Sequence, residues 1–270
     1  MHLADSTDRV IRTLRPDDFD AVFTAFGEAF SDYVIPLSPT REQLQEMLTR
    51  RGWAPHLSAG VFDGARMVAF TLNGFDDRVA YDSGTGVIPS HRRRGLGREM
   101  TDFVLPLLRD AGAERYVLEV IESNAPAIAL YRAAGFQETR KLQCWTYAAD
   151  APSAGPIARG SMRPAYCDVS PSWQNSTASI RRAHDRFEVI GGDDGYAVVF
   201  PSSGDLAQLA VAPASRRRGL GTRLLRDAVT IAGKPLRIIN VDDRSSDIAA
   251  FLQAAGARRT IRQLEMQLLL

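Results

Sequence analysis

Several features that would narrow the class of this protein are scarce in its 270-residue sequence. Only two cysteines are present, Cys144 and Cys167, too few for a disulfide framework or a cysteine metal cluster, so both are expected to be reduced thiols. The four histidines are isolated and give no metal-ligand spacing. No apolar run approaches the roughly 18 residues of a membrane-spanning helix. The first ten residues lack the basic-then-apolar pattern of a signal peptide. These absences predict a cytoplasmic protein without a metal and without a membrane partner.

An excess of charge of one sign is also missing. The 33 basic and 32 acidic side chains leave a net charge of +1, with −4 over residues 1–150 and +5 over the remainder. A nucleic-acid-binding module would need a broad basic face, which the first half does not provide, so no nucleic-acid partner is expected. The hydrophobic share of 45% is ordinary for a globular protein, and the length suits two domains better than one.

What the sequence does contain is an internal repeat. Residues 87–98 read VIPSHRRRGLGR and residues 211–223 read VAPASRRRGLGTR, 124 positions further on. Each copy is followed by apolar residues at helical spacing, a β-branched run, a short helix ending at a glycine (Gly135 or Gly256) and a closing strand. Pro106 is expected to kink or shorten the helix after the first copy. The pattern predicts one α/β unit used twice.

The remaining segments complete the two units. The expected elements are strands at 10–16, 57–63, 66–75, 78–87, 116–121 and 138–147 with helices at 16–30, 40–51 and 126–136, and then strands at 185–192, 196–201, 205–212, 236–241 and 258–269 with a helix at 247–257. Residues 151–164 are rich in Ala, Gly, Pro and Ser, which is typical of a linker. We therefore expect domains at 1–150 and 165–270.

The repeated turn has the composition of an anion site. Gly95 and Gly97 stand just before a helix, where the free amides of its first turn and the helix dipole favour a phosphate or pyrophosphate. The preceding arginines add positive charge. A tight strand-to-helix turn also needs glycine for packing alone, so this alternative stays open. The turn is not a Walker loop, and it lacks the third glycine of the dinucleotide fingerprint.

These motifs resemble a known family. Arg92-x-x-Gly95-x-Gly97 after Val87-Ile88-Pro89 resembles the acyl-CoA signature of the GCN5-related N-acetyltransferases (GNAT), and Arg216-x-x-Gly219-x-Gly221 repeats it. Asn124-x-x-Ala127-x-x-Leu130-Tyr131-x-x-x-Gly135-Phe136 resembles the family's second motif. The resemblance implies an α/β (α+β) fold of two tandem acyl-CoA N-acyltransferase domains, each a mixed, splayed central sheet flanked by helices. It also implies acetyl-CoA as co-substrate, held between the fourth and fifth strands.

The resemblance assigns roles to particular residues. It implies pantetheine contacts from Thr85, Gly86 and Val87, pyrophosphate contacts from Arg92, Arg93, Arg94, Gly95, Leu96, Gly97 and Arg98, and a channel position for Asn124. Tyr131 is expected to be the general acid that protonates the departing thiolate. Asn124 also suits a plain helix N-cap, and Tyr131 also suits a half-buried core position.

The general base is less defined. Family members often carry a carboxylate on the fourth or fifth strand, as a base or as the holder of a base water. Asp82, Glu119 and Glu122 are the candidates here, and each also suits a solvated or amine-binding carboxylate. Tyr33 lies in the segment before Pro36 where the family's acceptor loop usually falls. Tyr33 and Asp32 suit contact with an amine, whereas Tyr33 and Phe30 suit a core edge, which is the interpretation we favour.

The second half departs from the family at the important position. Aligning Gly256 on Gly135 places Leu252 at the position of Tyr131, Ser245 at that of Asn124 and Asn240 at that of Glu119. A possible second CoA site remains, comprising Val211, Arg216, Arg217, Arg218, Gly219, Leu220 and Gly221. Because leucine cannot protonate a thiolate, we expect a degenerate domain that binds CoA weakly or not at all and carries no chemistry.

The leading hypothesis is therefore an N-acetyltransferase that moves acetyl directly from acetyl-CoA to a primary amine of a small-molecule or peptide acceptor, with catalysis in the first domain. The alternative is a non-catalytic acyl-CoA-binding, sensing or scaffolding protein. Tyr131 favours the enzyme, because a binding protein has no need of it. The identity of the acceptor is not readable. The chain is expected to be a monomer with pseudo-dimeric domains or a homodimer.

Overall fold

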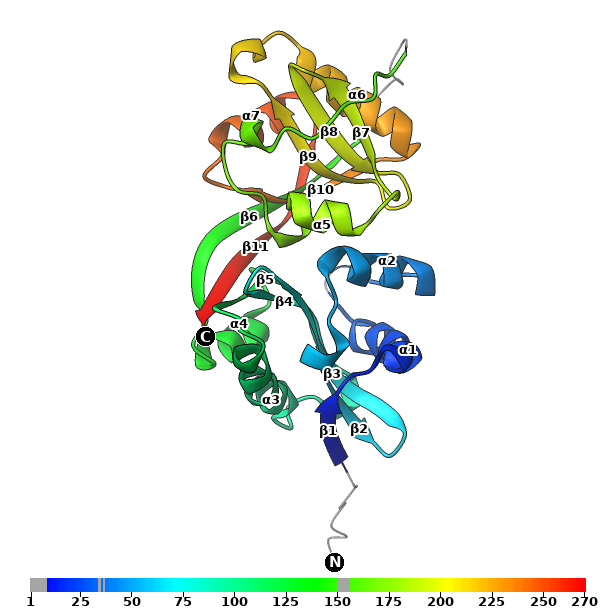
Figure 1. Cartoon of the computed structure of the whole chain (residues 1–270), viewed down its shortest axis with the longest axis vertical. Coiled ribbons are helices and arrows are strands. Elements are labelled where there is room, and N and C mark those ends of the chain that lie inside the picture. Colours follow the sequence, from blue (N-terminus) through cyan, green and yellow to red (C-terminus); the bar gives the residue numbers. More distant parts are fainter. Residues whose placement is uncertain (1–8, 34, 36, 150–155) are drawn as a thin grey trace, which may run out of the picture. The chain divides into compact units, whose positions relative to one another are not determined.

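A computed structural model describes residues 9–33, 35, 37–149 and 156–270 (Figure 1). The chain forms two compact units, each with a mixed sheet flanked by helices, which confirms the predicted fold class. The units interleave. Unit 1 takes residues 1–119, 124–137 and 266–270, and unit 2 takes 120–123 and 138–265. The segment 138–149, expected to end the first domain, thus counts with unit 2, and the last five residues count with unit 1. The sequence predicts no signal peptide in the first ten residues, of which 1–8 lie outside the described residues. The start of the expected linker, residues 151–155, also lies outside them.

Unit 1 is built on a sheet in the order β1-β2-β3-β4-β5. Its strands are β1 (Arg9–Thr13), β2 (Ala59–Asp63), β3 (Arg66–Asp76), β4 (Val79–Val87) and β5 (Arg115–Ile121), and its helices are α1 (Phe19–Ala29), α2 (Arg41–Arg51), α3 (Leu96–Asp110) and α4 (Ala125–Ala133). β1 to β4 pair antiparallel and β5 joins β4 parallel. Figure 1 shows α1 and α2 on one side of this sheet and α3 and α4 on the other.

The helix ends follow the chemistry of their residues. α2 begins with a capping box in which Thr40 and Gln43 accept each other's backbone amides. Asn124 accepts the Ala127 amide at 3.3 Å, so its predicted N-cap role is confirmed. Gly135 has φ +97°, as predicted for a helix end that needs the left-handed region. α3 continues past Pro106 to Asp110, so the proline does not shorten it; buried residues on both sides of the proline hold the helix against the core.

The sheet of unit 1 splays where the resemblance implies. β4 and β5 pair only from Val79–Arg115 to Asp82–Leu118, whereas β4 runs on to Val87. Beyond Asp82, β4 keeps its antiparallel partner β3 and no longer pairs with β5 among the described residues. The two strands therefore part at Asp82, and β5 does not pair with residues 83–87 of β4.

Unit 2 repeats this plan with a shorter front. Its sheet order is β11-β6-β10-β9-β8-β7. The elements are β6 (Gln137–Tyr147), α5 (Thr177–Arg182), β7 (Glu188–Gly192), β8 (Gly195–Phe200), β9 (Asp205–Val211), α6 (Leu220–Ala232), β10 (Leu236–Asp242), α7 (Ser246–Ala254) and β11 (Arg258–Leu269). The six-residue helix α5 was not predicted from the sequence. β9 and β10 pair parallel at a single position, Asp205 with Arg237, so this sheet also splays.

Each unit has its own core. In unit 1, Phe26 of α1 stacks on Phe70 of β3 at 6.0 Å between ring centroids, within a cluster that also includes Leu96 and Met100 of α3. In unit 2, α6 buries Leu224, Leu225 and Ala228 against β6, β8 and β10. Among the described residues, no helix is long and apolar enough to cross a membrane.

Candidate active site

A hydrogen-bonded group of three side chains lies where β4 and β5 part. Asp82 is only 6% exposed, and its Oδ2 accepts from the Tyr131 hydroxyl at 2.9 Å and from Thr85 Oγ1 at 2.8 Å. Its Oδ1 accepts the Gly84 amide at 2.9 Å. Thr85 Oγ1 also lies 2.6 Å from Thr71 Oγ1 of β3. Tyr131 of α4 and Asp82 of β4, separated by 49 residues, are thus held together by direct contact.

A β-bulge explains why Asp82 and Thr85 share a face. In a regular strand, residues three apart point to opposite sides. The pairing of β4 with β3 shifts between Gly84–Leu72 and Asp82–Asn73, so Ser83 is an extra residue. The extra residue turns Asp82 toward the side of Thr85 and α4. The Arg51 side chain of α2 donates to the Ser83 carbonyl at 2.7 Å and supports the bulge. Arg51 is a contributor that the sequence did not suggest.

The surroundings shift both titratable groups of the network. Burial raises the pKa of the Asp82 carboxyl, although hydrogen bonds from Thr85, Tyr131 and the Gly84 amide act in the opposite direction. Burial, followed by the negative charge of Asp82, raises the pKa of the Tyr131 phenol well above its ordinary value. Tyr131 therefore carries its proton at neutral pH, as a general acid must.

The second candidate carboxylate, Glu119, lies on the other face of the sheet. It accepts the hydroxyl of Tyr81, which precedes Asp82 in β4 and so points the opposite way. Burial, and after it the charge of Glu119, raises the pKa of Tyr81 well above its ordinary value. Glu122, the third candidate, pairs with Arg262 of unit 2 at 3.4 Å. The structure thus brings Asp82 and Tyr131 together and separates Glu119 from them by the thickness of the sheet.

The turn at 92–98 has the geometry of a helix N-terminal anion site. Gly95 is the N-cap of α3 at φ +82°, and Arg93 also has a positive φ of +60°. The first-turn amides of Leu96, Gly97 and Arg98 lack acceptors within the helix. Gly97 has a packing reason as well, because a Cβ there would stand 2.9 Å from Leu130 Cδ2 of α4. The packing interpretation is therefore confirmed at Gly97, and the anion site stays a prediction.

The arginines of the turn have protein partners of their own. Arg92 forms a two-pronged ion pair with Asp32, at 2.6 and 2.7 Å, and donates to the carbonyls of Ala29 and Val87. Arg94 donates to the Ser90 carbonyl at 3.2 Å, and Arg98 pairs with Asp102 at 2.8 Å. Arg92 thereby ties the end of α1 to the end of β4. Beside it, Tyr33 packs its ring on Phe30 at 5.2 Å, consistent with a core edge.

Strand alternation fixes which backbone groups of β4 point to the side that β5 has left. The Ile88 amide bonds to β3 through the Val68 carbonyl at 3.0 Å. Backbone groups of an antiparallel strand alternate between its two neighbours. Those of Val87 and Thr85 therefore point to the side that β5 has left. The Gly86 position has no room for a side chain, since a Cβ would lie 2.6 Å from the Phe70 ring.

Unit 2 keeps the turn and loses the polar network. Gly219 has φ +81° and Arg217 has φ +60°, nearly the values in unit 1. Arg216 reaches the Val211 carbonyl at 3.0 Å and Asp168 at 3.0 Å, matching the contacts of Arg92. In place of Asp82, Thr85 and Tyr131, unit 2 has three leucines that belong to one apolar cluster: Leu206, Leu209 and Leu252.

A buried loop closes the split between β9 and β10. Asn175 is 4% exposed and donates from Nδ2 to the Ile239 carbonyl of β10 at 2.8 Å. Its own carbonyl accepts from Gln208 of β9 at 2.7 Å. One residue therefore bridges both strands just beyond the point where they separate. The Ser245 hydroxyl, at the position of Asn124, makes no cap hydrogen bond.

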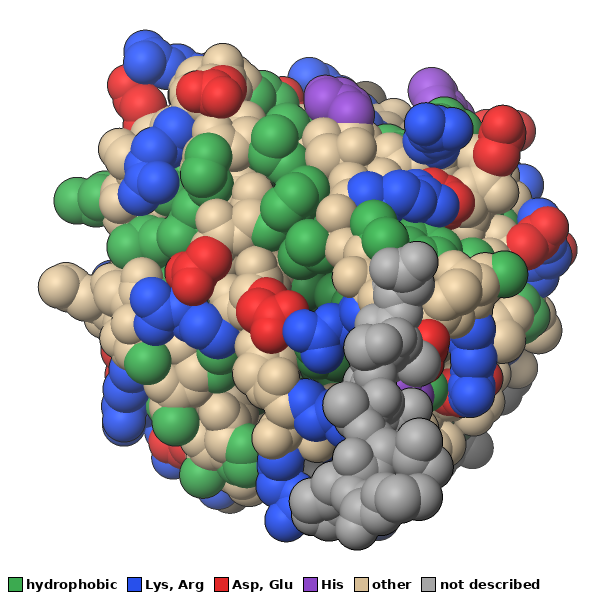
Figure 2. Space-filling view, turned by 90° about the horizontal axis from the view of Figure 1, so that it is seen from below, with side chains coloured by type: hydrophobic (Ala, Val, Ile, Leu, Met, Phe, Trp, Pro, Cys, Tyr) green, Lys and Arg blue, Asp and Glu red, His purple; other side chains and the backbone are tan. Residues whose placement is uncertain are grey.

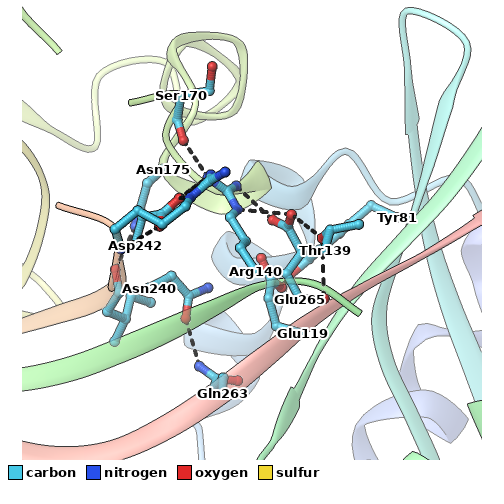
Figure 3. Close-up of polar contacts among 12 residues, drawn as sticks. Tyr81, Glu119, Thr139, Arg140, Ser170, Asn175, Asn240, Asp242, Gln263 and Glu265 are labelled. Carbon is cyan, nitrogen blue, oxygen red and sulfur yellow. Dashed lines mark hydrogen bonds and ion pairs between the residues drawn. The ribbon is translucent and has the colours of Figure 1, made fainter. Parts of the chain in front are cut away.

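A second polar cluster of unit 2 joins β6, β10 and β11. Arg140, whose side chain is 10% exposed, bonds to Glu265 at 2.7 and 2.9 Å and to Asp242 at 3.2 Å (Figure 3). It also donates to the Ser170 carbonyl at 2.6 Å. Burial raises the pKa of the Asp242 carboxyl, but hydrogen bonds from Arg244 and Arg140 outweigh it, and the pKa is lowered overall. This cluster is an internal ion network that holds neighbouring strands together.

Two further observations concern the charged side chains on the surface and the side chains that could bind a metal. On the face drawn in Figure 2, basic and acidic side chains are interspersed and do not gather into one basic surface. Within the described residues, no group of three or more His, Cys, Asp or Glu side chains could hold a metal ion.

Comparisons with known proteins identify the family. A model described as "Acetyltransferase (GNAT) family" matches residues 19–136 and 177–254. The mycothiol acetyltransferase of Catenulispora acidiphila is 29% identical over 134 residues, which cover 47% of this chain and 43% of that protein. The ribosomal protein bS18-alanine N-acetyltransferase of Escherichia coli (strain K12) is 34% identical over 87 residues, covering 31% of this chain and 56% of that protein. The chain thus spans about half the length of these curated relatives.

A solved structure extends the likeness to the whole chain. The GCN5-related N-acetyltransferase from Sphaerobacter thermophilus superposes with a TM-score of 0.71 and 15% identity, covering 99% of this chain and 97% of that one. At this identity the likeness concerns the fold alone.

Proposed function

The chain belongs to the GNAT acetyltransferase family, and from this premise we propose that unit 1 transfers an acetyl group from acetyl-CoA to a primary amine. The observation that carries the proposal is the joint presence in unit 1 of the Gly95 turn and of a Tyr131 hydroxyl bonded at the split between β4 and β5. Unit 2 has the turn and the split without the hydroxyl.

The residues of unit 1 fit acetyl-CoA at both ends. The first-turn amides of Leu96, Gly97 and Arg98 suit the pyrophosphate. The backbone groups of Thr85 and the Val87 amide, on the side of β4 that β5 has left, suit the amide groups of the pantetheine arm. The residues from Arg92 to Arg98, together with Gly86 and Asn124, complete the proposed cofactor site. When bound, acetyl-CoA supplies the activated thioester.

The residues of the chain then divide the acid–base work. The amine must lose a proton as it attacks, and the leaving thiolate must gain one. We assign the second task to Tyr131, which is protonated at neutral pH. The first task falls to Glu119, directly or through a water, because its carboxylate lies on the face away from Tyr131. The acceptor is proposed only as a primary amine of a small molecule or peptide. The names of the relatives, which concern mycothiol and a ribosomal-protein alanine, do not narrow it further.

For unit 2 the same reasoning supports a different role. With leucines at the three network positions and Asn175 across the split, it has no acid to offer and no open strand edge at that point. Unit 2 is proposed to bind CoA weakly or not at all at residues 216–221 and to carry no chemistry.

The test is thiol release from acetyl-CoA by the full chain, measured with a panel of primary amines and with matched tertiary amines as controls. Release that depends on a primary amine and falls sharply in Tyr131→Phe supports the proposal. Binding of acetyl-CoA without any amine-dependent release would instead favour the sensing or scaffolding alternative.

A further inference from the structure

Asp82 is a buried carboxylate that the fold itself does not require. Removing an ionised carboxylate from water costs free energy unless hydrogen bonds compensate. Asp82 accepts hydrogen bonds from three donors. Two of them are the side chains of Thr85 and Tyr131, and unit 2 has leucines at both of these positions. A residue whose burial is costly and whose partners are assembled from two elements needs a reason other than packing.

Unit 2 supplies the internal comparison. The pairing of β9 with β8 shifts between Gln208–Val198 and Leu206–Val199, so Ala207 is an extra residue at the position that Ser83 occupies in β4. The bulge, the parallel strand and the following turn are all retained. The carboxylate is not, since Leu206 stands at its position. The strand geometry therefore forms equally well around leucine, and the Asp82 network is an addition to unit 1.

The network fixes the position of one hydroxyl group. A phenol has a single hydrogen and can rotate it about the C–O bond. The 2.9 Å contact aims this hydrogen of Tyr131 at Asp82 Oδ2. Thr85, itself within 2.6 Å of Thr71, holds the same oxygen from the side of the sheet. The hydroxyl oxygen is thereby held at the split between β4 and β5, and rotation about the C–O bond can turn its hydrogen from Asp82 to an acceptor there.

We propose that Asp82 is a positioning residue for the acid Tyr131 and not the base of the reaction, with Thr85 as its anchor. This inference rests on the proposed function. As the carbon–sulfur bond breaks, the Tyr131 hydrogen turns about the C–O bond from Asp82 Oδ2 to the sulfur, which takes the bonding electron pair and this proton. The amine's proton passes to Glu119 or its water, and solvent returns a proton to Tyr131. Asp82 gains and loses no proton in this cycle. Its negative charge opposes a lasting phenolate, so Tyr131 is restored before the next turnover.

A double-mutant cycle on the full chain tests the inference. If Asp82 acts through Tyr131, Asp82→Leu lowers kcat about as much as Tyr131→Phe does, roughly 10²-fold or more. The pair Asp82→Leu/Tyr131→Phe is then no worse than Tyr131→Phe alone, to within about threefold. Asp82→Asn keeps an oxygen that accepts the Tyr131 hydroxyl, so it recovers part of the loss. The Kd for acetyl-CoA, measured by calorimetry, stays unchanged in all of these variants.

Two controls separate folding from function. The variant Asp82→Leu/Thr85→Leu/Tyr131→Leu copies the composition of unit 2 and should unfold as cooperatively as the parent while being inactive. If Asp82→Leu alone does not fold, the Asp82→Asn arm decides, with and without Tyr131→Phe. A further tenfold loss from Asp82 replacement in the Tyr131→Phe background would mean that Asp82 acts on its own, as a base, and would overturn the inference alone. Absence of turnover by the parent chain with every amine would overturn the proposed function, and this inference with it.

Discussion

Arg140 offers the sharpest test of the energetics of unit 2. Replacing it by methionine keeps most of the side-chain volume and removes the charge. Glu265, with a side chain 12% exposed, would lose both of its contacts to the guanidinium, and the Ser170 carbonyl would lose its donor. Asp242 would keep Arg244, 2.6 Å away. Removing one member of a buried ion network costs about 3–5 kcal/mol.

The assay is thermal and urea unfolding of the full chain. For a domain of this size, about 3–5 kcal/mol lowers the unfolding midpoint by roughly 10–20 °C. Arg159→Met is the matched control, because Arg159 pairs with Glu188 while its own side chain is 78% exposed. Exposed pairs contribute about 0–1 kcal/mol, so this variant should unfold near the parent.

The pH dependence gives a second reading of the same network. The folded-state pKa of Asp242 is lowered, so its ionised form is favoured by folding. That contribution is present above the unfolded value of about 4 and is lost as the pH falls through the folded pKa. The difference between the parent and Arg140→Met should therefore narrow below about pH 4. If Arg140→Met unfolds within about 1 kcal/mol of the parent at pH 7, the network does not stabilise unit 2.

Three further predictions concern unit 1. Tyr131→Phe should lower amine-dependent thiol release by about 10²–10⁴-fold, and it should lower the unfolding free energy by about 1–3 kcal/mol because Asp82 loses a donor; an unchanged rate would make Tyr131 structural. Gly95→Val should raise the calorimetric Kd for acetyl-CoA strongly and lower turnover, since φ there is +82° and the amides of the turn would be displaced. Gly219→Val, at φ +81°, should leave turnover unchanged. Equal effects of the two variants on turnover would refute the assignment of the cofactor turn to unit 1. Because the pKa of Asp82 is raised in the folded state, the parent loses stability relative to Asp82→Asn as the pH rises from about 4 through that pKa; unfolding at pH 4 and pH 7.5 measures the change, and a difference independent of pH contradicts it.

The repeat made much of the fold predictable. The glycines at 95 and 219 and the helix-ending Gly135 and Gly256 adopt the positive φ values that their positions imply. Asn124 caps its helix as its residue type predicts. These features depend on local backbone conformation, which short motifs specify well.

The interleaving of the units could not be predicted in the same way. The closing strands at 138–147 and 258–269 have similar alternating patterns, and either pattern suits either sheet. What assigns them is tertiary packing: Trp145 and Tyr147 enter the core of unit 2, and the Leu270 amide bonds to the Glu114 carbonyl of unit 1 at 3.0 Å. The six-residue helix α5 is likewise too short for a helical period to stand out.

The candidate site shows most clearly where sequence reasoning stops. Asp82 and Tyr131 were both candidates, but alternation along β4 would place Asp82 on the same side as Gly84 and Gly86, away from Thr85 and from α4. The bulge at Ser83 instead places Asp82 on the side of Thr85 and α4, and no residue type in the strand predicts this bulge. The same bulge recurs at Ala207 around leucine, so it belongs to the shared fold, while the polar side chains that exploit it belong to unit 1 alone. A bulge present in both units thus brings the Tyr131 hydroxyl and the Asp82 carboxylate together in unit 1, whereas unit 2 has leucines at these positions.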